Sequence, residues 1–175
     1  MVVQAQSAAD MYADPAYRQA QKLYFFAVQS EVFLSDAENA FKNLIRKYGP
    51  HPALQIYLSG ITALKARYTF NPFDKKDYFF QAVDEMDAIV KQYPQEPEVR
   101  FIRGSFYYYL PFFLGKRKEA RDDLTTLTSL LLRNAELYKR RYSSEVLRAI
   151  ISFLEQTGWV AEGDIAQLRR LYAAP

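Results

Sequence analysis

The chain of 175 residues has no cysteine and a single histidine, His51. The missing thiols exclude disulfides, thiolate-bound zinc and iron–sulfur clusters. One histidine, without an Asp-x-Asp-x-Asp-Gly loop, leaves no convincing set of metal ligands. The phosphate-binding patterns GxxxxGK[ST] and GxGxxG are also missing, which excludes nucleotide binding by those loops. The sequence therefore predicts no cofactor and no metal.

An excess of one charge and a long apolar run are likewise missing. The 23 basic and 20 acidic residues leave a net charge of +3, which is too balanced for a strong nucleic-acid footprint. No segment reaches the ~20 apolar residues that cross a bilayer. The longest candidate, Ser105–Leu114, is too short and contains Pro111. We expect no nucleic-acid partner and no membrane span.

The N-terminal stretch MVVQAQSAAD lacks the basic region and apolar core of an intact signal peptide. Its small residues, Ala5-Gln6-Ser7-Ala8, nevertheless resemble the residues found directly after an export segment. Two locations stay open: periplasmic or exported if a signal has been trimmed, and otherwise cytoplasmic. Residues 1–13 are expected to form a flexible N-terminus, and residues 14–175 a single helical domain, since this length suits one core.

Helical periodicity runs through almost the whole chain, and no convincing run alternates with period two. Prolines, small polar residues and glycines mark where helices begin and end. The expected helices run from Pro15 to about Leu34, Ser35 to Tyr48, Pro52 to Tyr68, Pro72 to Tyr93, Pro97 to about Pro111, Lys116 to Leu132, Ser143 to Gln156 and Glu162 to Tyr172. The sequence therefore predicts an all-α protein.

Two parts of the chain repeat each other. Ala37–Tyr48 matches Ala82–Tyr93 at an offset of 45 residues, with alanine, large apolar and tyrosine positions in common. Gly60 and Gly104 also correspond, where two helices would need to touch closely. Helix hairpins with small residues at crossings and a proline after the second helix are typical of α-solenoids. We expect antiparallel helix hairpins stacked as a short right-handed α-solenoid, with about seven to eight helices.

These features resemble tetratricopeptide (TPR)-like repeats over roughly residues 35–133, although Arg103 stands at a position that is usually apolar. A narrower stretch is similar to a group of bacterial TPR-like proteins. The shared motifs are Lys65, the Asn71-Pro72 turn, Lys75, Arg100-Phe101-Ile102-Arg103 and Pro111-Phe112-Phe113-Leu114-Gly115. The resemblance covers about a third of the chain. It implies a TPR-like fold and supplies no activity.

The main candidate site is a stripe formed by Arg100, Arg103 and Tyr107 at i, i+3 and i+7 of one helix. Two guanidiniums beside a tyrosine suit a carboxylate, a phosphate or an acidic peptide terminus. In TPR-like proteins the first helix of each hairpin lines the concave surface, which fits this position. The Asn71-Pro72 turn, with Lys65 and Lys75 nearby, would add a basic rim.

Each of these residues also has a structural interpretation. The arginines can pair with nearby carboxylates such as Glu98, Asp84 or Asp87, and Asn71 can cap the helix that comes after it. The aromatic block Phe106–Phe113 offers stacking surfaces, but a helix buried on several sides is the more usual reason for such a block. Trp159 is expected to pack the last helix onto the stack.

The leading hypothesis is a non-enzymatic protein- or peptide-binding or scaffold module that uses the concave face of the solenoid. The arginines would contact an acidic group of the partner. Two alternatives stay open: a small anionic ligand or glycan in an arginine- and aromatic-lined pocket, and a structural oligomer subunit. No enzyme activity is expected, because His51 has no local nucleophile, and carboxylate pairs such as Asp122 and Asp123 are common on solvated helix faces.

Overall fold

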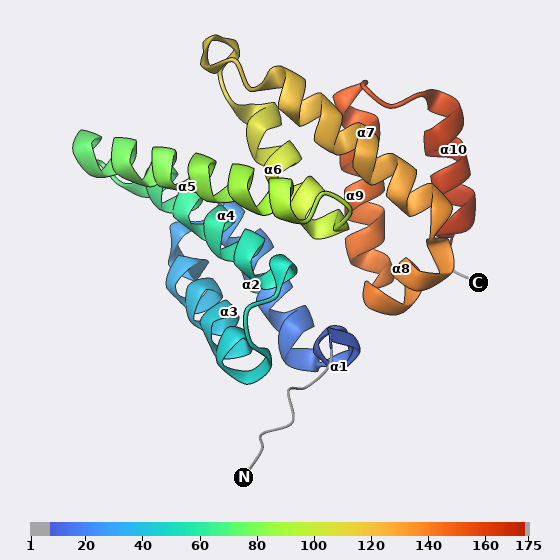
Figure 1. The fold of residues 1–175 in the computed structure, drawn as a ribbon, viewed down its shortest axis with the longest axis horizontal. Helices are drawn as coiled ribbons and strands as arrows, with labels where there is room; N and C mark the ends of the chain where they lie inside the picture. Colours follow the sequence, from blue (N-terminus) through green and yellow to red (C-terminus); the bar gives the residue numbers. More distant parts are fainter. Residues whose placement is uncertain (1–7, 174–175) are drawn as a thin grey trace. The chain divides into compact units, whose positions relative to one another are not determined.

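The computed structural model describes residues 8–173, which form ten α-helices and two 3₁₀ turns without any strand (Figure 1). The elements are α1 (Ala8–Ala13), α2 (Pro15–Gln29), η1 (Glu31–Phe33), α3 (Leu34–Tyr48), α4 (Pro52–Tyr68), α5 (Pro72–Gln92), α6 (Pro97–Tyr109), η2 (Phe112–Leu114), α7 (Arg117–Arg133), α8 (Ala135–Arg141), α9 (Ser144–Thr157) and α10 (Glu162–Leu171). The predicted all-α class is confirmed. The helix count is higher than expected.

Helix starts agree with the signals in the sequence. Asp14 accepts a hydrogen bond from the Ala16 N–H at 2.8 Å, and Pro15 occupies the first position of α2. Asn71 does the same for the Phe73 N–H at 3.0 Å, ahead of Pro72. In each case the side chain satisfies a free N–H, and proline fixes a helical φ at a position that needs no donor.

One helix end and two short helices differ from the prediction. The helix expected from Pro15 to Leu34 ends at Gln29, because Ser30 is extended with φ −150° and η1 separates α2 from α3. Helix α8 was missed, since its seven residues contain too few apolar positions to show a period. Helix α1 lies within the segment expected to be flexible. Residues 1–7 of that segment fall outside the described residues, whereas Met11 and Tyr12 of α1 are buried.

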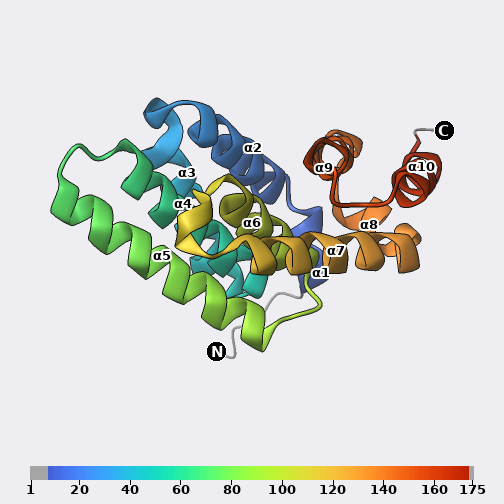
Figure 2. The same ribbon diagram turned by 90° about the horizontal axis from the view of Figure 1, so that it is seen from above.

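The chain divides into two compact units, Met1–Pro94 and Gln95–Pro175. In the first unit α2 packs against α3, α4 packs against α5, and α3 also contacts α4 (Figure 2). Its core is aromatic: the rings of Phe41 and Tyr57 are stacked with centroids 4.6 Å apart. A Cβ added to Gly60 would lie 2.6 Å from the Tyr24 hydroxyl oxygen, so α4 needs glycine at this position to approach α2.

In the second unit α6 packs against α7, α9 against α10, and α10 also contacts α7. A Cβ added to Gly104 would lie 2.9 Å from the Cβ of Asp123 on α7. The close helix contacts predicted at Gly60 and Gly104 are therefore confirmed. Each hairpin joins helices that are neighbours in the sequence, and the stacking of these hairpins into a solenoid stays a prediction. Across residues 8–173, none of the helices combines the length and apolar character required to cross a membrane.

Candidate functional site

Helix α6 carries the predicted arginine stripe and is enclosed on nearly every side. Its residues from Pro97 to Gly104 are buried, Tyr107 is buried as well, and only Tyr109 is exposed. Arg100, Arg103 and Tyr107 are therefore buried, as are the apolar Val99 and Ile102 of the same helix. Phe106 is half-buried. Arg100, Arg103 and Tyr107 do not form an open face of this helix.

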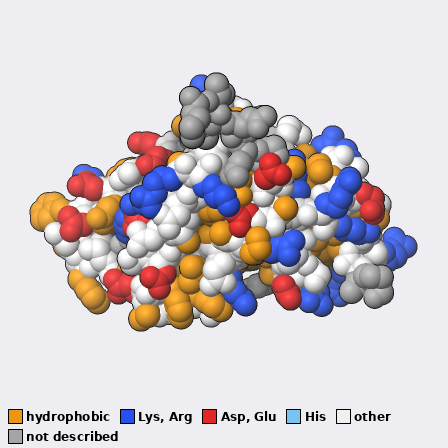
Figure 3. Space-filling view, turned by 90° about the horizontal axis from the view of Figure 1, so that it is seen from below, with side chains coloured by type: hydrophobic (Ala, Val, Ile, Leu, Met, Phe, Trp, Pro, Cys, Tyr) orange, Lys and Arg blue, Asp and Glu red, His pale blue; other side chains and the backbone are white. Residues whose placement is uncertain are grey.

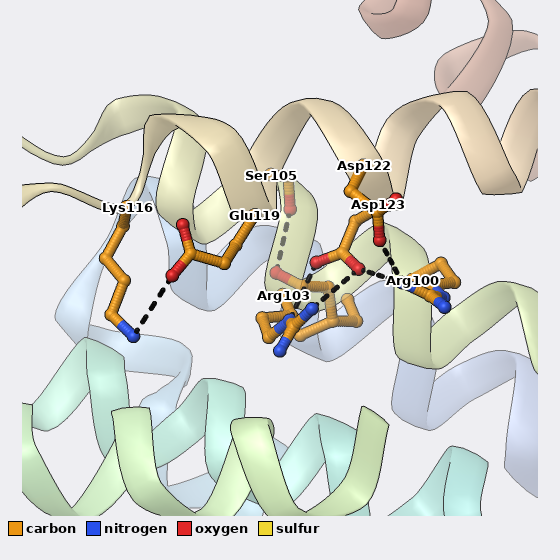
Figure 4. A network of polar contacts seen from close by, with 8 residues as sticks. Arg100, Arg103, Ser105, Lys116, Glu119, Asp122 and Asp123 are labelled. Atoms are coloured by element: carbon orange, nitrogen blue, oxygen red, sulfur yellow. Dashed lines mark hydrogen bonds and ion pairs between the residues drawn. The ribbon is translucent and has the colours of Figure 1, made fainter. Parts of the chain in front are cut away.

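Two arginines of α6 and two aspartates of α7 form an arginine–aspartate network (Figure 4). Arg103 binds Asp123 through two hydrogen bonds, from Nε to Oδ2 at 2.7 Å and from Nη2 to Oδ1 at 2.9 Å. Arg100 donates from Nη1 to Asp123 Oδ1 at 2.6 Å and to Asp122 Oδ2 at 3.0 Å. Asp123 therefore receives both guanidiniums, and Asp122 closes the network at its outer edge.

The network places two positive and two negative charges together. The Asp123 side chain is 0% exposed, whereas that of Asp122 is 67% exposed. Burial raises the pKa of Asp123, and the hydrogen bonds and charges of Arg103 and Arg100 act in the opposite direction. The guanidinium of Arg103 also lies 5.5 Å from the ring centroid of Tyr107. The arginines thus hold α6 to α7 through an internal carboxylate.

The burial of Asp123 corrects the expectation that this aspartate lies on a solvated helix face. On α7, the carboxylates that bind the arginines are Asp122 and Asp123, which were not among the partners suggested by the sequence. A signal for Asp123 was present: it lies among Ala120, Leu124 and Leu127, which share the apolar stripe of α7. A carboxylate inside such a stripe needs a buried counter-charge.

Lys65 and Asn71 belong to the first unit. Lys65 Nζ lies 2.8 Å from Glu38 Oε2 and links α4 to α3, while Asn71 caps α5. Burial raises the pKa of Glu38, but hydrogen bonds from Lys42 and Lys65 outweigh it and hold that pKa below its ordinary value. The predicted site residues are therefore split between the two units.

An exposed aromatic face on α5 was not predicted. Phe73 and Phe80 are 76% and 52% exposed, and Asp77 and Asp84 are exposed beside them. These four residues stand at i, i+4, i+7 and i+11, so they lie along one face of the helix. We call them the α5 ridge. Hydrophobic side chains also reach the surface between charged ones in the space-filling view (Figure 3).

The loop between α6 and α7 carries a second exposed apolar group. Phe112 and Phe113 are 79% and 73% exposed, which differs from the packing role expected for the whole aromatic block. Trp159 packs against α6 and α7, and its expected role in packing the last helix onto the stack stays a prediction. Its ring lies 5.0 Å from that of Tyr108 and 5.4 Å from the guanidinium carbon of Arg117.

The single histidine lies at the start of a helix. His51 accepts a hydrogen bond through Nδ1 from the Ala53 N–H at 3.2 Å, so it caps α4. Within residues 8–173, no group of three or more histidine, aspartate or glutamate residues is arranged to hold a metal ion.

Comparison of the chain with protein families, with curated proteins and with solved structures finds no match. The TPR-like assignment therefore stays a prediction. The functional interpretation depends on the geometry of the arginine–aspartate network and of the two exposed apolar surfaces.

Proposed function

We propose that this protein is a non-enzymatic protein- or peptide-binding module whose contact surface is the α5 ridge. The observation that carries the proposal is the exposure of Phe73 and Phe80 on one line of a helix. The inward face of α5 already supplies Ala82, Met86 and Val90 to the core. More than half of each phenylalanine side chain therefore stays available to a partner.

The spacing of the ridge favours a helical partner. Residues at i, i+4, i+7 and i+11 form the row that one helix presents to another, as in coiled-coil seams and helix-in-groove recognition. Full burial of each phenylalanine ring would contribute about 1.5–3 kcal/mol. Asp77 and Asp84 lie on the same line, so the partner segment that fits is an amphipathic helix carrying basic side chains.

The arginine–aspartate network supports a contact surface away from α6. An acidic partner at Arg100 and Arg103 would have to displace Asp123 from a buried position. On α4 and α6, the helices expected to line a concave face, only Arg67 and Tyr109 are exposed. A small anionic ligand held by these arginines has correspondingly less support than a partner on the α5 ridge.

The experiment compares three forms of the full chain: wild type, F73S/F80S, and the matched control F112S/F113S. Each is used to capture proteins from a native extract, and any captured protein is then purified and titrated by calorimetry. We expect direct binding to weaken about tenfold or more in F73S/F80S, because each lost ring removes an apolar contact. The control should bind as the wild type does.

Two results would overturn the proposal. One is that every purified partner binds F73S/F80S as tightly as the wild type, or that no captured protein binds directly. The other is that light scattering shows a wild-type oligomer that F73S/F80S dissociates, which would make the α5 ridge an interface between copies and the protein a structural subunit. Thermal unfolding of both variants checks that the fold is retained.

A further inference from the structure

The α6–α7 loop presents an apolar tip. Residues Pro111–Gly115 are all exposed, and the loop projects past the ends of α6 and α7 (Figure 1). The tip is an ordered turn: the Leu114 N–H donates to Pro111 O at 3.0 Å, and the Gly115 N–H donates to Phe112 O at 3.1 Å. Gly115 closes it with φ +70°. The turn therefore holds Phe112, Phe113 and Leu114 outward.

A group of cations comes directly after the tip. Lys116 Nζ lies 3.8 Å from Glu119, whereas Arg117, Lys118 and Arg121 are exposed. Along the part of the chain that the structure describes, none of these last three has a carboxylate partner. Their spacing places them on one side of the first two turns of α7. The tip is thus followed by three exposed cations, with the carboxylates of Glu119 and Asp122 in the same two turns of α7.

These cations are unfavourable for the helix that carries them. The N-terminus of a helix carries partial positive charge, so acidic residues stabilise the first turn and basic ones do not. Arg117 and Lys118 occupy that turn of α7 together with one acidic residue, Glu119, and Lys116 provides no side-chain cap. An external anion would relieve both the repulsion and the missing cap.

We propose that the α6–α7 loop docks onto an anionic lipid membrane surface. Phe112, Phe113 and Leu114 would enter the boundary between headgroups and acyl chains, and Arg117, Lys118 and Arg121 would contact lipid phosphates. Stable interfacial binding needs both buried apolar area and attraction to anionic lipid, and this loop supplies both at one place. A small tip exposed on all sides also suits a deformable bilayer better than a preformed protein pocket.

The two exposed apolar surfaces differ in their charge. The α5 ridge carries Asp77 and Asp84, which an anionic membrane would repel, whereas the α6–α7 loop is followed by cations. Lipid is therefore assigned to the loop only. This role is independent of the proposed function, because the two surfaces share no residue.

Trp159 supplies a local reporter. It is the only tryptophan of the chain, and its ring lies 5.4 Å and 5.2 Å from the guanidinium carbons of Arg117 and Arg121. Its fluorescence should therefore change when these arginines contact lipid. The protein needs no added label for this measurement.

The test is co-sedimentation of the full chain with vesicles of phosphatidylcholine alone or with about 30% phosphatidylglycerol, at about 0.05 M and about 0.5 M salt. We expect binding to the anionic vesicles with a shift in Trp159 emission, and binding about tenfold or more weaker to the neutral ones. F112S/F113S should weaken binding about tenfold or more, and R117Q/K118Q/R121Q about fivefold per charge with loss of the salt dependence. F73S/F80S should bind as the wild type does.

Three results would overturn the proposal. The first is that the wild type does not bind the anionic vesicles, and the second is that F112S/F113S binds them unchanged. The third is that the loop is an interface between copies or for an acidic protein: light scattering or capture would then show complexes lost in F112S/F113S, with no vesicle binding. Circular dichroism of each variant verifies the fold, which these exposed substitutions should leave intact.

Discussion

At the scale of single residues, Asp123 determines what Arg100 and Arg103 can do. Both guanidiniums donate hydrogen bonds to its buried carboxylate, so a ligand that took these donors would have to displace Asp123. Removing that carboxylate leaves two buried positive charges without their shared counter-charge, which is far more costly than losing an exposed ion pair.

We therefore expect Asp123→Ala to lower the free energy of unfolding by about 3–5 kcal/mol. The matched control is Asp122→Ala, which also removes a contact to Arg100 but from an exposed position, and should cost about 1 kcal/mol or less. Urea unfolding followed by circular dichroism measures both. Equal losses in the two variants would contradict the structural role given to Asp123.

Asp123 also shows which properties of a single residue can be predicted from the sequence and which cannot. The unusual position of Arg103 was visible from the repeat, and both arginines turned out to be buried. Their partners were not predicted, because periodicity places residues on a face of one helix but does not say which positions of two helices meet. The exposed phenylalanines of α5 were missed for the same reason: exposure depends on where neighbouring helices end.

A second residue-scale prediction concerns pH. Hydrogen bonds from Lys47, from the Ala16 N–H and from Tyr48 lower the pKa of Asp14 from 3.8 to about 2. The folded state thus prefers the ionised carboxylate. The stabilisation is complete above the ordinary pKa and is lost as the pH falls through the lowered one.

Asp14→Ala should cost about 1 kcal/mol at neutral pH, and this difference from the wild type should shrink between about pH 4 and about pH 2. Asp14→Asn separates the two roles, because asparagine still caps α2 but cannot titrate. Urea unfolding over this pH range measures both variants. A difference for Asp14→Ala that stays constant down to about pH 2 would argue against the contacts described.

At the scale of helices, close approach depends on glycine. Gly104→Ala would place a methyl group 2.9 Å from Asp123 Cβ and 3.0 Å from Leu124 Cδ2. The Cβ of Asp123 is fixed by the backbone of α7 and cannot rotate away, so we expect a loss of about 1–3 kcal/mol. Gly163→Ala on α10 is the control, since no atom lies within 4 Å of its added Cβ. It should be neutral or slightly stabilising, and chemical denaturation distinguishes the two.

Helix boundaries were predictable where a local signal fixes them. Asp14-Pro15, Asn71-Pro72 and Gly158 act through their own backbone and nearest N–H groups, and these starts and ends agree with the sequence. The end of α2 at Gln29 and the short α8 have weaker local signals. These two boundaries depend on tertiary packing, which cannot be predicted from a few neighbouring residues.

At the scale of the whole molecule, the chain divides after Pro94 into two compact units, while the single domain expected over residues 14–175 stays a prediction. The first unit contains its own buried aromatic core, with Tyr17, Phe41 and Tyr57 fully or almost fully enclosed. We expect a fragment of residues 1–94, produced alone, to be helical and to unfold cooperatively on heating. A fragment without a cooperative transition would favour one domain over two.

The pairing of helices that are neighbours in the sequence has a consequence for how the chain acquires its structure. Helices α2 and α3, α4 and α5, α6 and α7, and α9 and α10 form contacts across short connections. Such contacts cost little loop-closure entropy, and chains rich in them fold within microseconds to milliseconds. A hairpin can therefore form once its second helix has left the ribosome, while later helices are still being synthesised. Synthesis would then set an order of assembly that starts with α2 and α3.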